Sequence, residues 1–330
     1  MSRVRHGFAA PGLLADWLAS PPPDAAIEIA AERVAAAVVS PRGGGLAVTG
    51  HAFEPLPPGV VTPSLTGPNV QDRHAAASAV RRVLQRIGTR PRRVALVIPD
   101  TAAKVSLLRF EKVPARRDDF EQLLRWQLRK AAPFPVETAS VTWAGAAAVG
   151  AEGREFVVEL AREEAVREYE TVCEDAGLYA GLVDIATFGL LGLLEDGVAA
   201  GGDLLLVHVR PDYTSMAIVR GDQMIFYRNR PEDGEEGLPD LVHQTAMYYQ
   251  DRLSGSGFAR VLLAGGGGAP GAADMARRSL EERLGVPVEP LDPARVATLT
   301  DRIAPGAGLL DVLGPAIGLM RRTRAEAVHA

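Results

Sequence analysis

The fold of this chain is decided by VALVIPDTAAKVSLLRFEKVPA, residues 94–115, and by DFEQLLRWQLRKAAPFPVE, residues 119–137. The apolar run before Pro99 predicts a strand that is buried on both faces, and the partial alternation after it predicts a second strand. Asp118 and Glu121 have the spacing of a capping box, which predicts the start of a helix that Pro133 ends. Two strands and a helix are therefore expected here.

One face of this predicted helix is apolar. Core packing is the usual explanation of such a stripe, although a partner can also bind to it. The face contains Phe120, Leu123, Leu124, Gln127, Leu128 and Ala131.

The order of predicted elements repeats along the chain. In residues 24–55, two apolar runs separated by a Pro-Gly turn predict a hairpin, and residues 74–88 follow as a helix that Gly88 closes. Residues 203–230 predict a three-stranded meander, and a helix follows it up to residue 254. We therefore expect an α/β protein with two related lobes and mixed sheets.

We expect the chain to have three parts. Residues 1–23 form an N-terminal appendage, residues 24–200 form the first lobe, and residues 201–330 form the second lobe after a Gly-Gly break. The appendage has apolar residues near helical spacing behind Arg3 and Arg5. It is interpreted as a helix packed on the body or as a weak contact with a membrane surface.

Composition and charge exclude several classes of protein. The 330 residues include 36 basic and 41 acidic side chains, a net charge of -5, so no positive field attracts nucleic acid. The single Cys173 cannot form an internal disulfide and is compatible with a reducing compartment. Neither a transmembrane run nor a signal-peptide pattern occurs, so we expect a cytoplasmic protein.

The residue patterns of common catalytic sites are missing. The histidines are not clustered with one another or with Cys173, which argues against a metal site, and no GxSxG motif occurs. The glycine run VLLAGGGGAPG, residues 261–271, either contacts a ligand or forms a plain tight turn. It is not a Walker A loop, because no lysine follows position 130.

The joint order of these motifs resembles the PilM family of type IV pilus assembly proteins, which belongs to the actin-like ATPase superfamily. The resemblance covers about residues 24–323. It rests on the two stretches quoted first and then on VCEDAGLYAGLVDIATFGLL, YRNR, TAMYYQDRL, VLLAGGGGAPG, LGVPVEPLDP and GPAIGLMRR. The resemblance implies an actin-like two-lobed fold, with a small subdomain inserted at about residues 100–150 and a last helix that returns to the first lobe.

In that superfamily, Asp-x-Gly turns of the two lobes handle phosphate and its metal ion, and a Gly-Gly turn carries adenosine. The resemblance places Glu28 and Ala30 in the first turn, His208, Arg210 and Thr214 in the second, and Gly265, Gly266 and Gly267 in the third. Neutral imidazole is a poor ligand for magnesium, and Arg210 adds bulk where a glycine would let amides approach phosphate. We therefore expect no catalysis and no required cofactor.

A second departure concerns a subdomain that family members place between the YRNR-like strand and the TAMYYQDRL-like helix. Here only PEDGEEGLPDLVHQ, residues 231–244, joins them, which is too short for a subdomain. Nucleotide closure and actin-like polymerisation use that subdomain. The alternative function nevertheless remains a switch that binds or hydrolyses ATP with magnesium through Glu28, Arg210 and Thr214, and a metabolite kinase is a weaker third reading.

In the resembling proteins, the inserted subdomain and the adjoining lobe form a groove for the cytoplasmic N-terminal peptide of a bitopic inner-membrane partner, the PilN type. The resemblance therefore implies a scaffold held at the inner membrane through such a PilN-like partner. The apolar groove residues would be Phe110, Phe120, Leu124, Trp126 and Phe134, and the residues facing acidic groups of the peptide would be Arg109, Arg116 and Arg125. Core packing is the alternative explanation for the apolar residues.

Overall fold

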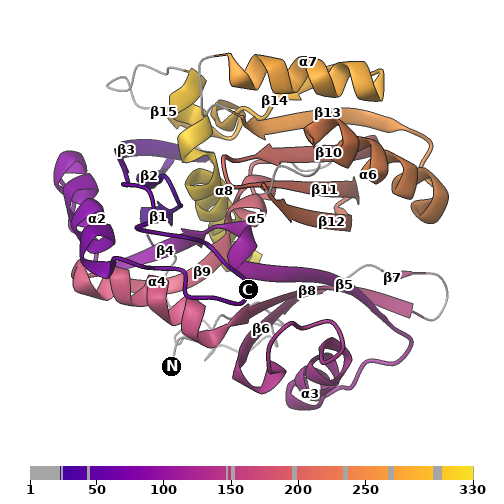
Figure 1. Cartoon of the computed structure of the whole chain (residues 1–330), viewed down its shortest axis with the longest axis horizontal. Coiled ribbons are helices and arrows are strands. Elements are labelled where there is room, and N and C mark those ends of the chain that lie inside the picture. Colours follow the sequence, from indigo (N-terminus) through magenta and orange to yellow (C-terminus); the bar gives the residue numbers. More distant parts are fainter. Residues whose placement is uncertain are drawn as a thin grey trace.

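The structure is a computed structural model that describes residues 23, 25–42, 45–145, 148–149, 153–194, 199–232, 237–266, 271–299 and 307–329 (Figure 1). The N-terminal appendage predicted at residues 1–23 lies outside these residues, apart from Pro23. The described residues form two larger sheets, one in each lobe, and a smaller third sheet.

The sheet of the first lobe has the strand order β15-β3-β2-β1-β4-β9. Its strands are β1 (Ala25–Ile29), β2 (Arg33–Arg42), β3 (Gly45–Pro55), β4 (Arg93–Ile98), β9 (Tyr179–Ile185) and β15 (Ala297–Leu299). β1, β2 and β3 are antiparallel, whereas β4 and β9 continue the sheet in parallel. β15 pairs with β3, so a strand from late in the chain completes the first lobe.

The sheet of the second lobe has the strand order β12-β11-β10-β13-β14. Its strands are β10 (Ala199–Val209), β11 (Tyr213–Gly221), β12 (Gln223–Pro231), β13 (Phe258–Gly265) and β14 (Val288–Pro290). Again three antiparallel strands are followed by two parallel ones. The two lobes therefore share the arrangement that the repeated element order predicted.

Helices alternate with the two sheets in layers, as Figure 1 shows. The outer face of the first sheet packs on α2 (Arg73–Ile87) and α4 (Glu163–Asp175), and the outer face of the second sheet packs on α6 (Leu238–Leu253) and α7 (Ala272–Leu284). Between the sheets lie α5 (Ala186–Leu191) and α8 (Ala307–His329). Apolar side chains of both sheets contact this middle layer, so the lobes share a core.

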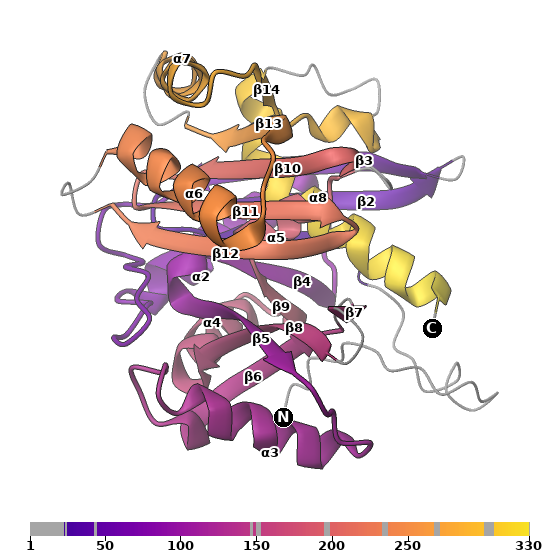
Figure 2. The same cartoon turned by 90° about the vertical axis from the view of Figure 1, so that its right-hand side faces the viewer.

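The inserted subdomain is a small sheet with one helix. Its strands are β5 (Ala103–Phe110), β6 (Ala139–Ala144), β7 (Ala148–Val149) and β8 (Gly153–Arg162), with β8 between β5 and β6, and its helix is α3 (Arg117–Leu128). Figure 2 shows α3 on the side of this sheet away from the second lobe. The subdomain extends to Arg162 rather than to about residue 150, because the central strand β8 begins only at Gly153.

Single 3-10 turns occur at η1 (Asp100–Ala102), η2 (Val136–Thr138) and η3 (Pro293–Arg295). The helix predicted after the first hairpin is confirmed as α2. Asp72 accepts a hydrogen bond from Ala75 N at its start, and Gly88 ends it in the left-handed conformation at φ 73°. The expected short connection is also found, since β12 ends at Pro231 and α6 begins at Leu238.

Two local predictions were wrong. The first apolar run was expected to be one strand, but it breaks at Ala30–Glu32 into β1 and β2, where Ala30 N donates to Arg33 O. The run contains no glycine or proline to signal this turn. The predicted capping box at Asp118 does not form either. α3 begins at Arg117 without a side-chain cap, so Asp118 lies inside the first turn, where the helix dipole favours a carboxylate.

Candidate functional site

The turn between β1 and β2 presents charged side chains at the boundary between the lobes. Glu28 on β1 and Ala30 in the turn are both buried. Arg33, at the start of β2, donates to Glu32 Oε1 at 2.7 Å and to Glu28 Oε2 at 3.4 Å. The first turn therefore holds one guanidinium group between two carboxylates.

Arg210, at the end of β10, reaches from the second lobe to this turn. Its Nη2 donates to Glu32 Oε1 at 2.8 Å, and its Nη1 lies 3.5 Å from Glu28 Oε1. The side chain is only 4% exposed. Burial disfavours its charged form, but the facing Glu28 and Glu32 outweigh burial and raise the pKa of the guanidinium above its usual value. Glu28, Glu32, Arg33 and Arg210 together form what we call the interlobe ion cluster.

The interlobe ion cluster has two positive and two negative groups, so it offers no net positive charge to a polyphosphate. Within it, Arg33 Nε, Arg210 Nε and Glu32 Oε2 are buried and have no hydrogen-bond partner among the described residues. Two donor groups and one acceptor group of the cluster are therefore left without a partner in this part of the chain. A water molecule can satisfy such a mixture, whereas the oxygens of an ionised phosphate only accept.

A buried polar network lies at the same boundary. Asp100 of the first lobe accepts hydrogen bonds from Thr187 N at 2.9 Å and from the hydroxyl groups of Thr187 and Ser215. Burial disfavours the ionised carboxyl, but His208, Ser215 and Thr187 outweigh it and hold the pKa of Asp100 below its usual value. His208 Nδ1 lies 2.9 Å from Thr187 Oγ1. His208, at the position expected for a metal-binding aspartate, therefore belongs to this interlobe network.

The glycine turn after β13 is already hydrogen-bonded within the protein. Gly265 N donates to Asp311 Oδ1 at 2.7 Å, and Gly266 N donates to Val209 O at 2.8 Å. Gly265 has φ 78°, and a Cβ atom there would lie 2.0 Å from Val209 O, so close packing explains this glycine. Gly267 lies outside the described residues. Neither amide of the described part of the turn remains for a ligand.

These residues do not fit a magnesium nucleotide. Glu28 already faces two arginines, Thr214 is buried on β11, and the described glycine amides have protein acceptors. A magnesium ion would need free carboxylate oxygens, and phosphate would need free donors. Among the described residues, no three or more His, Cys, Asp or Glu side chains come together to hold a metal.

The residues predicted to bind a partner do not lie on one surface of the subdomain. Phe120 and Leu124 are buried in the core between α3 and the sheet, and the Phe120 ring packs edge-on at 5.5 Å from Phe110. Phe110 and Phe134 are half-buried beside that core. Trp126, in contrast, is 64% exposed on the outside of α3. Core packing therefore accounts for part of the predicted set.

The three arginines that were predicted to bind the partner also lie on different surfaces. Phe110 packs toward α3, so the neighbouring Arg109 lies on the other face of β5, because side chains alternate along a strand. Arg116 is exposed just before α3. Arg125 donates to Val136 O at 2.6 Å and to Ala139 O at 3.1 Å, so its guanidinium fixes the chain that follows α3.

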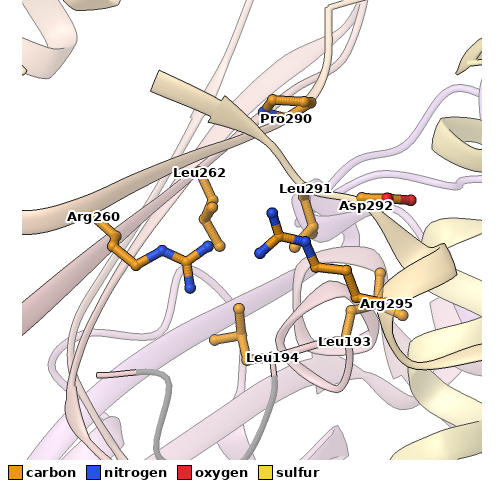
Figure 3. Close-up of a pocket in the computed structure, with 8 residues that line it drawn as sticks. All are labelled: Leu193, Leu194, Arg260, Leu262, Pro290, Leu291, Asp292 and Arg295. Carbon is orange, nitrogen blue, oxygen red and sulfur yellow. The ribbon is translucent and has the colours of Figure 1, made fainter. Parts of the chain in front are cut away.

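Two hollows lie away from these residues. The pocket in Figure 3 has a volume of about 20 Å³, room for roughly one water molecule. Arg260 and Arg295 line it and both approach Glu289, at 2.8 and 3.6 Å. A larger open hollow of about 760 Å³ is lined by residues of α6 and α7 on the outside of the second lobe. Neither hollow contains a residue predicted to bind nucleotide or partner.

Comparison with known proteins identifies the family. The sequence profile of the family described as type IV pilus assembly protein PilM matches residues 26–252, more than half of the chain. This chain belongs to the PilM family. A solved PilM-PilN type IV pilus biogenesis complex contains a chain that is 21% identical in sequence to this PilM family member, with a TM-score of 0.77. The alignment covers 92% of this chain and 99% of that one.

Two further solved structures overlap less closely. The ethanolamine utilization protein EutJ from Carboxydothermus hydrogenoformans is 12% identical, with a TM-score of 0.49, over 92% of this chain and 90% of that one. A Bacteroides thetaiotaomicron protein with actin-like ATPase fold is 9% identical, with a TM-score of 0.45, over 81% of this chain and 89% of that one. The fold of this PilM family member is the expected actin-like fold of two lobes. None of its described helices is long and apolar enough to cross a membrane.

Sequence reasoning missed the partners of the predicted residues. Glu32 and Arg33 complete the interlobe ion cluster, and Asp100 and Ser215 complete the polar network. The signal for Glu32 and Arg33 was a pair of adjacent charges that, with Glu28, interrupts the apolar run AAIEIAAERVAAAVV. Such a pair marks either a turn or a buried ion pair. The interpretation of residues 24–55 as a two-stranded hairpin concealed it.

Proposed function

We propose that this PilM family member is a non-catalytic cytoplasmic scaffold of type IV pilus assembly or a related secretion machine. It binds the N-terminal peptide of a PilN-like inner-membrane protein through the inserted subdomain, and this partner holds it at the membrane. Membership of the PilM family supports the pilus role. The close overlap in fold with a chain of a solved PilM-PilN complex supports a partner of that type.

The assignment of the binding surface rests on the exposed ring of Trp126. Large aromatic side chains are enriched in the centres of protein interfaces, and burying one contributes strongly to affinity. Phe120, Leu124 and Leu128 form the buried side of α3, so Trp126 projects from its opposite side and contributes little to the core. Phe134, half-buried beside the subdomain core, and Arg116, exposed just before α3, are the apolar and cationic groups that the proposal adds to Trp126.

The scaffold works without a nucleotide in this proposal. A bound ATP would have to separate Arg210 from Glu28 and Glu32, and it would have to compete with Asp311 and Val209 for the glycine amides. Leaving one partner of a buried ion pair uncompensated costs about 3–5 kcal/mol. The charge balance of the interlobe ion cluster therefore favours a scaffold over an ATP-dependent switch.

Fluorescence anisotropy with a labelled N-terminal peptide of a cognate PilN-like protein tests the proposal. We expect Trp126→Ala to weaken binding by about tenfold or more, since a hot-spot aromatic contributes about 2 kcal/mol or more. Phe134→Ala should weaken it as well. Tyr179→Ala is the matched control, because Tyr179 is 52% exposed and lies on β9 outside the subdomain.

Peptide binding by both variants at the parental affinity would contradict the assignment of the surface. Failure of the parent itself to bind the peptide would contradict the assignment of the partner. Circular dichroism and thermal unfolding of each variant distinguish either result from misfolding. Truncating the exposed ring of Trp126 should leave the midpoint within a degree or so of the parent, whereas Phe134→Ala removes a half-buried ring and should lower the midpoint.

A further inference from the structure

We propose that Arg210 takes the place of a nucleotide as the connection between the two lobes, and that the interlobe ion cluster holds the protein in one arrangement. This inference goes beyond the scaffold role and does not depend on the identity of the partner. It rests on where the two turns meet and on the atoms that join them.

The two turns that meet come from equivalent places in the two lobes. One follows β1, the first strand of the first lobe, and the other follows β10, the first strand of the second. The resemblance assigns both turns to phosphate. In this protein the Arg210 side chain crosses between them instead, with its Nη2 at 2.8 Å from Glu32 Oε1.

The connection is built from more than one contact. Glu28 has Arg33 at 3.4 Å on one oxygen and Arg210 at 3.5 Å on the other, so it joins the two guanidinium groups. The neighbouring polar network crosses the same boundary, because Asp100 of the first lobe accepts from Ser215 of the second. The polar network is buried, and in the ion cluster the side chains of Glu28 and Arg210 are buried while Glu32 is partly exposed. Burial strengthens electrostatic interactions relative to water.

The physical consequence concerns motion of the lobes. Any rotation that opens the boundary would pull Arg210 away from Glu28 and Glu32 and leave buried charges unpaired. A protein whose lobes are joined by a ligand changes shape when the ligand leaves, because the ligand has different affinities for the open and closed states. Arg210 is part of the chain and cannot leave, so the arrangement of the lobes should not respond to ATP.

The experiment measures the distance between the lobes in the full chain. Spin labels are attached at His74→Cys on α2 of the first lobe and at Met275→Cys on α7 of the second, both exposed positions. The native Cys173 is fully buried and does not compete for label. Pulsed electron paramagnetic resonance then gives the distribution of label-to-label distances with and without millimolar ATP and magnesium.

We expect one narrow distribution for the parent, unchanged by ATP and magnesium. Arg210→Met should widen the distribution or shift it to longer distances. Glu32→Gln, a milder variant on a side chain that is 33% exposed, should widen it less while keeping the fold intact. Arg220→Met is the matched control, since it removes the 2.6 Å ion pair to Asp203, which lies within the second lobe.

Each outcome of this experiment either supports or overturns the proposal. A wider distribution in both cluster variants, but not in Arg220→Met, supports the proposal. A parental distribution that shifts with ATP and magnesium would overturn it, and so would parental distances in Arg210→Met and Glu32→Gln. The peptide-binding experiment with Trp126→Ala is unaffected by any of these results, so this inference and the proposed function can fail independently.

Discussion

Gly318 of α8 lies directly against the backbone of Gly189 of α5. A Cβ atom at position 318 would stand 2.0 Å from the Gly189 carbonyl oxygen, and one at Gly192 would stand 2.2 Å from Gly318 O. The two helices therefore cross backbone to backbone in the layer between the sheets. Arg321 of α8 reinforces the crossing by donating to Gly192 O at 3.0 Å and to Leu194 O at 2.7 Å.

We expect Gly318→Ala to lower the free energy of unfolding by about 1–3 kcal/mol, because the added methyl group must push the two helices apart. Urea denaturation measures the change. Gly145→Ala is the control, because its Cβ atom meets nothing within 4 Å and its φ is not positive. Equal stability of the two variants would show that the crossing relaxes without cost.

Arg125 should act on stability more than on partner binding. Its guanidinium donates to the carbonyl oxygens of Val136 and Ala139, so Arg125→Ala leaves those groups without their donor. We expect a loss of about 1–3 kcal/mol in unfolding free energy. Arg129→Ala should lose less than about 1 kcal/mol, since the pair that Arg129 forms with Glu137 is exposed. Similar losses for both variants would contradict the structural role of Arg125.

Glu159 should make stability depend on pH. Burial raises the pKa of this carboxyl from 4.5 to about 7, with Asp100 adding to the effect and Arg322 and Thr142 opposing it. Between these two pKa values the folded protein keeps a proton that the unfolded chain has released. The contribution of this proton to the free energy of unfolding is therefore present at low pH and is lost as pH rises from 4.5 to about 7.

Urea denaturation at about pH 5 and pH 8 measures this loss. The parent should lose about 1–2 kcal/mol more than Glu159→Gln over that interval, since one pKa unit corresponds to about 1.4 kcal/mol and the side chain is half-buried. Glutamine keeps the hydrogen-bonding shape of the protonated acid and cannot titrate. An identical pH dependence in both proteins would refute the role of Glu159.

Cys173 should be inert in the folded protein. Burial, with help from Glu170 and Glu174, raises the pKa of its thiol to about 12, so almost no thiolate exists near neutral pH. We expect an aromatic disulfide reagent to react with less than one thiol per molecule in buffer and with one in denaturant. Rapid reaction under native conditions would mean that α4 opens locally.

ATP with magnesium should leave the thermal midpoint unchanged. A ligand at a hundredfold its dissociation constant stabilises the folded state by about 2.7 kcal/mol, which would shift the midpoint by several degrees. We expect a flat response up to millimolar ATP. A rising midpoint would favour the ATP switch, and release of phosphate that disappears in Glu28→Ala would then establish hydrolysis.

Periodicity and turn residues predicted most elements of the fold. The spacing of Val80, Val83 and Leu84 before Gly88 predicted α2, and the strands around Gly221 predicted the meander of the second lobe, because these signals come from near neighbours in the chain. The break at Ala30–Glu32 was missed, since its turn is held by hydrogen bonds from Ala30 N and from the distant Leu56 N. No turn residue in the sequence announces it.

The candidate site was predicted as a set of positions and not as an arrangement. Sequence placed Glu28, Arg210 and Gly265 in the three relevant turns, and it identified Arg210 as the departure that disfavours phosphate. It could not show that Gly265 N donates to Asp311, because that contact joins β13 to α8. It also treated Phe120 and Trp126 alike, although α3 turns one toward the core and the other toward solvent.

The sequence by itself determined the family, the repeated order of the two lobes and the identity of the residues in each turn. These properties depend on composition, periodicity and motif order along the chain. The tertiary structure alone decided that Arg210 pairs with Glu32, 178 positions away, and thereby connects the lobes. A contact over that separation depends on how both lobes pack on α5 and α8, and a local pattern carries no information about how two folded lobes meet.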